Sequence, residues 1–131
     1  MRTLIVEDDF TCRLFLQRLL SPYGESHVAV NGVEAIDAFK AAMAQGHAYD
    51  LICMDIMMPE MDGQTALVKI RELEESAAVP WKHHVKVVTT TALGDIDAVM
   101  AAFHGMCDAY LTKPIDAQAL RERLRTLRLV I

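Results

Sequence analysis

Long apolar runs are missing from this sequence: none approaches the roughly 20 residues that a membrane-spanning helix requires. The start, Met-Arg-Thr followed by three apolar residues, is too short for a secretory signal peptide. Cysteine is also scarce, and the three cysteines are widely spaced without a CxxC pair, which disfavours a disulfide framework and a zinc site. We therefore expect a cytoplasmic protein with no membrane contact.

Positive charge is in short supply as well. The formal net charge of −5 disfavours a free-standing nucleic-acid binder, which usually carries a basic patch for phosphates, so no direct nucleic-acid contact is expected. Adjacent His83 and His84 do not indicate a metal site, because neighbouring residues on a strand point to opposite faces. Four arginines near the C-terminus are typical of the solvated face of a last helix: Arg121, Arg123, Arg125 and Arg128.

Apolar residues are abundant, at 53% of 131 residues, which is enough for one domain with a single core over 1–131. They fall into two alternating patterns. Apolar recurrence every three or four positions predicts five helices, over 12–20, 35–43, 66–73, 96–103 and 117–127. Short apolar runs between them predict five strands, over 3–6, 26–30, 50–54, 85–90 and 108–111.

Helix-capping residues agree with these boundaries. Asn31 with Glu34 has the form of a capping box, Gly46 marks a helix end, and Asp116 is a typical N-cap. Strands alternating with helices predict an α/β fold: a doubly wound, five-stranded parallel sheet with helices on both faces. In the flavodoxin-like strand order 2-1-3-4-5, the switch point lies between the first and third strands.

Chemically active side chains follow four of the predicted strands. Glu7 and Asp8 follow the first, Asp55 the third, Thr91 the fourth and Lys113 the fifth. The carboxyl ends of parallel strands meet at one edge, which is where open α/β sheets bind ligands. Carboxylates, a hydroxyl and an ammonium at that edge are what a Mg²⁺-assisted phosphoryl-transfer site needs.

The sequence resembles the receiver domain of two-component response regulators over nearly its whole length. Single motifs of this kind are weak, but four in order at family-like separations are specific. The matching motifs are Val-Glu-Asp-Asp (6–9), Met-Asp-Ile-Met-Met-Pro-Glu-Met-Asp-Gly (54–63), Thr-Ala (91–92) and Tyr-Leu-Thr-Lys-Pro (110–114).

The resemblance implies an Mg²⁺ site and a phosphoacceptor. Asp55 would be the nucleophile that attacks a phosphohistidine and becomes an aspartyl phosphate. Asp8, Asp55 and the backbone carbonyl of Met57 would ligate Mg²⁺, and Glu7 would act mostly through bound water. Asp9 is interpreted as the N-cap of the first helix, with a direct metal role as the alternative.

Further roles come from the same resemblance. Lys113 would pair with Asp55 before transfer and with the phosphoryl group afterwards, and its bond to Pro114 would be cis. Thr91 is preferred over Thr90 as the hydroxyl that contacts the phosphoryl group, because Ala92 and the 22-residue gap to Lys113 match the family pattern. Tyr110 would be a switch residue that moves together with Thr91.

Two positions tune the lifetime of the phosphoryl group in such domains, and here they are Met57 and Leu93. Both are apolar and cannot orient an attacking water, so slow dephosphorylation is expected. Met57 also stands where aspartyl-phosphate hydrolases of the haloacid-dehalogenase type carry a second Asp, which disfavours that enzyme class.

The sequence is thus interpreted as a single-domain response regulator of the chemotaxis-regulator kind and not as a turnover enzyme. Its phosphodonor would be a histidine kinase or a histidine phosphotransfer protein, docking near Phe10, Thr11 and Leu14 on the first helix. Its output surface would span roughly 95–128 and contact an unknown protein target. We expect a monomer or a weak, phosphorylation-linked dimer. A phosphorelay intermediate and a phosphorylation-independent interaction module remain alternatives.

Overall fold

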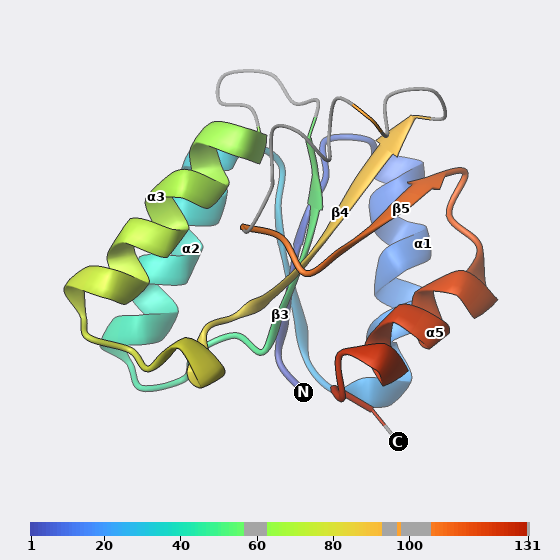
Figure 1. The fold of residues 1–131 in the computed structure, drawn as a ribbon. Coiled ribbons are helices and arrows are strands. Elements are labelled where there is room, and N and C mark those ends of the chain that lie inside the picture. The colour runs from blue at the N-terminus through green and yellow to red at the C-terminus, as the bar shows by residue number, and fades with distance from the viewer. Residues whose placement is uncertain (57–62, 93–96, 98–105, 131) are drawn as a thin grey trace.

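The computed structural model describes residues 1–56, 63–92, 97 and 106–130. Five parallel strands form one sheet in the order β2-β1-β3-β4-β5, as predicted (Figure 1). The strands are β1 (Thr3–Val6), β2 (Ser26–Ala29), β3 (Leu51–Asp55), β4 (Lys86–Ala92) and β5 (Ala109–Lys113).

Helices cover both faces of the sheet, which confirms the doubly wound prediction. The described helices are α1 (Phe10–Leu20), α2 (Gly32–Ala44), α3 (Gly63–Ser76) and α5 (Ala117–Thr126). Figure 1 shows α1 and α5 on one face and α2 and α3 on the other. The helix predicted over 96–103 lies outside the described residues apart from Asp97. Within the described part of the chain, no helix is long and apolar enough to cross a membrane.

Strands β1 and β3 are buried on both faces, and their apolar residues, 4–6 and 51–54, run without polar interruption. Successive side chains enter opposite layers: Ile52 and Met54 join the core under α2 and α3, whereas Leu51 and Cys53 join the core under α1 and α5. Burial raises the pKa of the Cys53 thiol to about 12, so this cysteine acts as a small hydrophobe.

Side-chain caps fix where the helices begin. Asp9, Asn31 and Asp116 each accept a hydrogen bond from the backbone N–H three residues further on, at 2.8, 2.8 and 2.9 Å. The Glu34 carboxylate accepts from the N–H of Val30, one residue before the N-cap, at 2.9 Å. The three predicted N-caps are therefore confirmed, and Asp9 is the N-cap of α1.

The predicted ends of β4 and β5 were wrong by two residues. β4 runs to Ala92 instead of 90, and β5 runs to Lys113 instead of 111. The polar residues Thr91 and Thr112 lie beyond the apolar runs of the two strands in the sequence, yet they pair with each other in the sheet. Thr91 and Lys113 thus lie on strands, where backbone pairing fixes their positions.

A buried carboxylate on α3 binds the segment that leads into β4. Glu74 is 2% exposed and accepts hydrogen bonds from Arg71 Nη1 and from the N–H of Val85, both at 2.7 Å. Arg71 also donates to the carbonyl of Met106 at 2.7 Å. Because Met106 lies just before β5, this network anchors the segment that leads into that strand.

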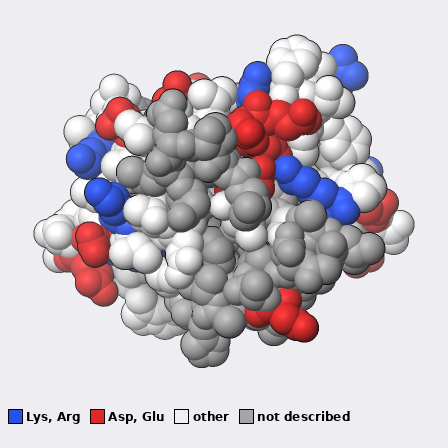
Figure 2. All heavy atoms as spheres, turned by 90° about the horizontal axis from the view of Figure 1, so that it is seen from above, with Lys and Arg blue, Asp and Glu red and all other residues white. Residues whose placement is uncertain are grey.

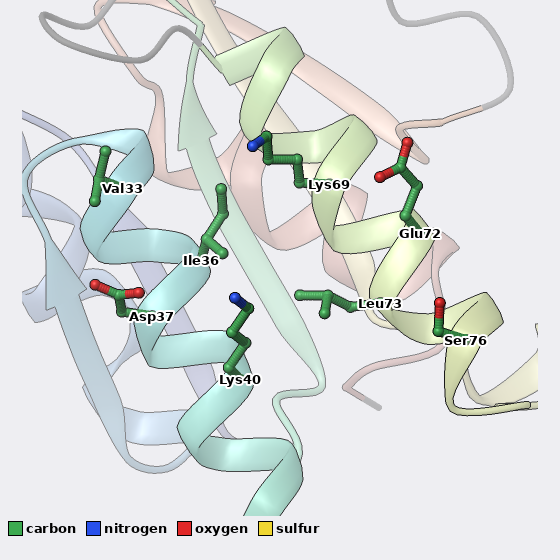
Figure 3. A pocket seen from close by; sticks show the side chains of 8 residues that line it. All are labelled: Val33, Ile36, Asp37, Lys40, Lys69, Glu72, Leu73 and Ser76. Carbon is green, nitrogen blue, oxygen red and sulfur yellow. The ribbon is translucent and has the colours of Figure 1, made fainter.

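A groove of about 400 Å³ runs along the outer seam between α2 and α3. Figure 3 shows Lys40 and Lys69 extending into it from opposite helices, over the apolar Ile36 and Leu73. The groove lies on a flank of the domain and contains none of the strand-end residues, so the chemistry predicted from the sequence must be sought elsewhere.

Both chain ends lie at the edge of the sheet where the strands begin (Figure 1). The terminal amine of Met1 donates to the carbonyl of Tyr23 at 3.1 Å, and the N–H of Leu129 donates to the carbonyl of Leu124 at 3.0 Å. The opposite edge, where the strands end, carries Asp55 and Lys113 as the last residues of β3 and β5.

Candidate functional site

Three carboxylates converge at the carboxyl edge of the sheet. Glu7 and Asp8 directly follow β1, and Asp55 is the last residue of the neighbouring strand β3. One oxygen of each lies within 4.8 Å of the others, although the two strands are far apart in the sequence. Glu7 is fully buried and Asp55 is 5% exposed, whereas Asp8 faces solvent. Figure 2, which looks down on this edge, shows acidic side chains gathered beside a basic one.

Lys113 reaches this cluster from the end of β5. Its Nζ lies 2.7 Å from Oε1 of Glu7 and 3.1 Å from Oδ2 of Asp55. The Lys113–Pro114 peptide bond is cis, as the resemblance implied. One ammonium therefore bridges two buried carboxylates that come from different strands.

The charges of this trio depend on one another. Burial alone would raise the pKa of Glu7, but the ammonium of Lys113, 2.7 Å from its Oε1, holds it down, at about 2. Burial likewise disfavours a charged Lys113, yet the hydrogen bond to Glu7 and the charge of Asp55 raise its pKa above the ordinary value. Three carboxylates face one ammonium, so the cluster retains negative charge that a further cation can neutralise.

Glycine allows α3 to begin directly against the end of β3. A Cβ on Gly63 would lie 2.8 Å from the carbonyl oxygen of Asp55 and 2.8 Å from Cα of Ile56, and both are backbone atoms that cannot rotate away. The N–H of Gly63 donates to the carbonyl of Ile56 at 3.2 Å. The start of α3 thus supports the backbone that carries Asp55.

The three threonines of β4 are fully buried. Thr90 pairs with Asp55 on one side and with Leu111 on the other, and Thr91 pairs with Thr112, one residue before Lys113. Both candidate hydroxyls predicted from the sequence therefore come from the strand that separates Asp55 from Lys113. Tyr110, on the adjacent strand, is half-buried.

Arg13 is a residue of this site that the sequence interpretation missed. Its Nη1 donates to the carbonyl of Glu7 at 3.1 Å and to the carbonyl of Asp8 at 3.4 Å. The available signal was its place four residues after the N-cap Asp9, because long helical side chains lean back toward the helix start. Met57 and Leu93, which the sequence also singled out, lie outside the described residues.

This arrangement can be compared with known proteins. The family model described as the response regulator receiver domain matches residues 3–125. The chain belongs to the response regulator receiver domain family.

Relatives of this receiver domain include chemotaxis regulators of similar length. The chemotaxis protein CheY of Treponema pallidum is 38% identical over 128 residues, which cover 96% of this chain and 81% of that protein. The chemotaxis protein CheY of Bacillus subtilis is 31% identical, with 94% and 93% of the two chains covered. The predicted family is thus confirmed.

Solved structures of receiver domains share the fold. The receiver domain of the sensor histidine kinase PA1611 from Pseudomonas aeruginosa, which has a magnesium ion coordinated in its active-site cleft, matches with a TM-score of 0.74, 26% identity and 97% coverage of both chains. The Saccharomyces cerevisiae co-crystal structure of the histidine phosphotransfer protein Ypd1 with the receiver domain of Ssk1 matches with a TM-score of 0.77, 25% identity, and coverage of 100% of this chain and 92% of that one. Receiver domains are signalling modules of two-component systems, not enzymes that turn over an external substrate.

Proposed function

We propose that residues 1–131 form one receiver domain that accepts a phosphoryl group on Asp55 and signals through a conformational switch. The observation that carries this proposal is the position of Asp55: a buried carboxylate at a strand end, 3.1 Å from Lys113 Nζ and grouped with Glu7 and Asp8. A buried nucleophile beside a fixed ammonium and an acidic cluster suits in-line phosphoryl transfer, which depends on positioning and charge neutralisation.

Mg²⁺ is the proposed cofactor, and the residues present fit it. One carboxylate oxygen each of Glu7, Asp8 and Asp55 lies within 4.8 Å of the other two, and the described cluster contains no cysteine or histidine. Oxygen-only donor sets favour a hard ion such as Mg²⁺. Asp8, Asp55 and the Met57 carbonyl would hold the ion, and Glu7 would act through water. Bound there, Mg²⁺ would offset charge on the transferred phosphoryl group.

In the proposed reaction, an oxygen of Asp55 forms a bond to phosphorus while the bond from phosphorus to the imidazole nitrogen of the phosphohistidine breaks. The imidazole leaves with the bonding electron pair and takes a proton from solvent. Lys113 turns from the Asp55 carboxylate to the new phosphoryl oxygens, and its bond to Glu7 keeps the ammonium in place.

The switch would begin at β4 and β5. The hydroxyl of Thr91 would donate a hydrogen bond to the phosphoryl group. Tyr110 would become more buried as the loop after Thr91 moves inward. Output would pass to a protein target through a surface within roughly 95–128, of which residues 97 and 106–128 are described. Met57 and Leu93 would prolong the phosphorylated state because neither can orient an attacking water.

The phosphodonor would be a histidine kinase or a histidine phosphotransfer protein. The phosphotransfer protein Ypd1 forms a complex with the receiver domain of Ssk1, to which this chain is similar. Whether the phosphoryl group ends at Asp55 or moves on in a phosphorelay depends on the partners, and a phosphorylation-independent module is the alternative if Asp55 is never modified.

Labelling with a small phosphodonor tests the proposal. In Mg²⁺, the protein should gain one acid-stable, base-labile phosphoryl group, and Asp55→Asn should gain none. Asp50→Asn is the matched control, because Asp50 is an exposed aspartate next to the opposite end of the same strand. Undiminished labelling of Asp55→Asn, or loss of labelling in Asp50→Asn alone, would contradict the assignment.

A further inference from the structure

The loop between β1 and α1 must hold two of the three carboxylates in place. Glu7 is buried and bound to Lys113, but Asp8 is exposed, so the backbone of the loop determines where its carboxylate points. The N-cap bond from Cys12 N–H to Asp9 Oδ2, at 2.8 Å, joins the end of this loop to α1. The N–H of Asp9 also donates to Oε2 of Glu7 at 3.3 Å.

Arg13 adds a second link between the helix and the loop. The same terminal nitrogen, Nη1, donates to two successive carbonyls, those of Glu7 and Asp8, at 3.1 and 3.4 Å. These carbonyls precede the first helical acceptor, the carbonyl of Asp9, which accepts from the N–H of Arg13 at 2.9 Å. Arg13 thus holds the loop through its backbone and its side chain together.

The guanidinium is itself held in position. Its central carbon lies 5.5 Å from the centroid of the Phe10 ring, within the range of a cation–π contact. Arg13 is half-buried, and the chain between its Cα and its guanidinium has to fold back along the first turn of α1 to make these bonds. A planar, rigid guanidinium suits this task better than the flexible ammonium of lysine.

We propose that Arg13 is a positioning residue for the metal site: it fixes the peptide groups of Glu7 and Asp8 so that both carboxylates face Asp55 before any ion binds. The inference rests on the proposed function for the identity of the ion, but its structural part concerns the loop alone. Groups that orient metal ligands typically change metal affinity by about 10–100-fold when they are removed.

Two substitutions separate positioning from simple charge. Arg13→Lys keeps the positive charge and loses the two-carbonyl contact, whereas Arg13→Gln loses both, and both residues form helices as readily as arginine. Arg18→Gln is the matched control, because it removes the same charge from the exposed last turn of the same helix. Calorimetry with Mg²⁺ alone should show a dissociation constant raised about tenfold in both Arg13 variants and unchanged in Arg18→Gln.

Amide hydrogen exchange without Mg²⁺ provides a readout that does not depend on the ion. Both Arg13 variants should exchange faster at residues 7–9 than the parent, with unchanged protection in β3 and in the rest of α1. Parent-like exchange at 7–9 in both variants overturns the proposal. So does parent-like Mg²⁺ affinity in Arg13→Lys, which would leave only a charge effect. If the parent itself binds no Mg²⁺, the proposed function fails, and the exchange data alone decide the role of Arg13.

Discussion

Lys113 is the residue on which the charge balance of the site depends. It bridges Glu7 and Asp55, two buried carboxylates that would otherwise repel each other. The pKa of Glu7 is lowered, so its contribution to stability is fully present above the ordinary value of 4.5 and is lost as the pH falls toward 2. The pKa of Lys113 is raised, so its contribution is present below 10.5 and is lost only above that value.

Lys113→Met should therefore destabilise the metal-free protein most at neutral pH. The loss in unfolding free energy at pH 7 should be somewhat below the about 3–5 kcal/mol typical of a broken buried ion pair, because the Lys113 side chain is 28% exposed. Toward pH 3 the loss should shrink, since Glu7 without its partner takes up a proton more readily. Urea unfolding at several pH values, without metal, measures this difference.

Lys82→Met is the control for that experiment, because Lys82 is exposed in the turn before β4. Its effect should be small and independent of pH. An equal loss of stability at pH 3 and pH 7 in Lys113→Met would mean that the lysine contributes by packing and not by charge.

The roles of several single residues could be predicted from the sequence because they depend on residues nearby in the chain. Asp9 caps the helix that it precedes, and Asp55 ends an apolar strand, so local pattern was sufficient for both. Two contacts were not predictable in this way. The bond from Lys113 to Glu7 is shorter than its bond to Asp55, and Arg13 reaches back to the loop carbonyls; both depend on side-chain geometry that residue spacing does not encode.

At the scale of elements, α1 combines a site-facing side with an exposed apolar surface. Phe10 is 67% exposed and Phe15 is 40% exposed, while Leu16 and Leu20 pack into the core. Large exposed aromatic residues on the helix that follows Glu7 and Asp8 would suit the proposed partner helix, which would bring its phosphohistidine to Asp55.

Phe10→Ala should slow phosphotransfer from any histidine phosphotransfer domain that labels the parent protein. A loss of about tenfold or more is expected, because truncating an interface anchor costs about 2 kcal/mol. Labelling by a small phosphodonor should fall much less than this transfer does, since Phe10 acts on the site indirectly, through the guanidinium of Arg13. Trp81→Ala is the control: Trp81 is 80% exposed in the turn before β4 begins, at the other edge of the sheet. Equal effects of both variants on transfer would place the docking surface elsewhere.

The elements themselves were predicted better than their ends. All five strands and four helices follow from periodicity and caps, because an amphipathic stripe or an apolar run indicates which residues are buried. The strand order 2-1-3-4-5 rests on the flavodoxin-like fold type, and the structure confirms it. The extra residues of β4 and β5 follow from pairing between two threonines, which an apolar run cannot reveal. The network of Arg71 and Glu74 was also missed, since a charged pair on α3 normally indicates a solvated surface.

At the scale of the whole molecule, the proposed phosphoryl site and the proposed output surface are connected through β4 and β5. Thr91 and Lys113 stand near the ends of these adjacent strands, and Tyr110 lies on the second. Phosphorylation would shift a pre-existing equilibrium by making better contacts in one state than in the other.

Beryllofluoride, added with Mg²⁺ as a stable mimic of the phosphoryl group, should reveal that shift. Backbone amide resonances should change within 7–20 and 55–63, next to the site, and also within 95–128. Asp55→Asn treated in the same way should show neither set of changes. If the changes stop at 7–20 and 55–63, the protein carries a phosphoryl group without an output switch.

The position of the two chain ends has a consequence for how this unit can be combined with others. Both ends leave the domain at the edge where the strands start, and the acidic cluster occupies the opposite edge (Figure 1). A neighbouring module joined at either end, or at both, would therefore leave the approach to Asp55 unobstructed. The same geometry makes the unit suitable for insertion into larger signalling chains, and affinity tags at either terminus should leave phosphorylation undisturbed.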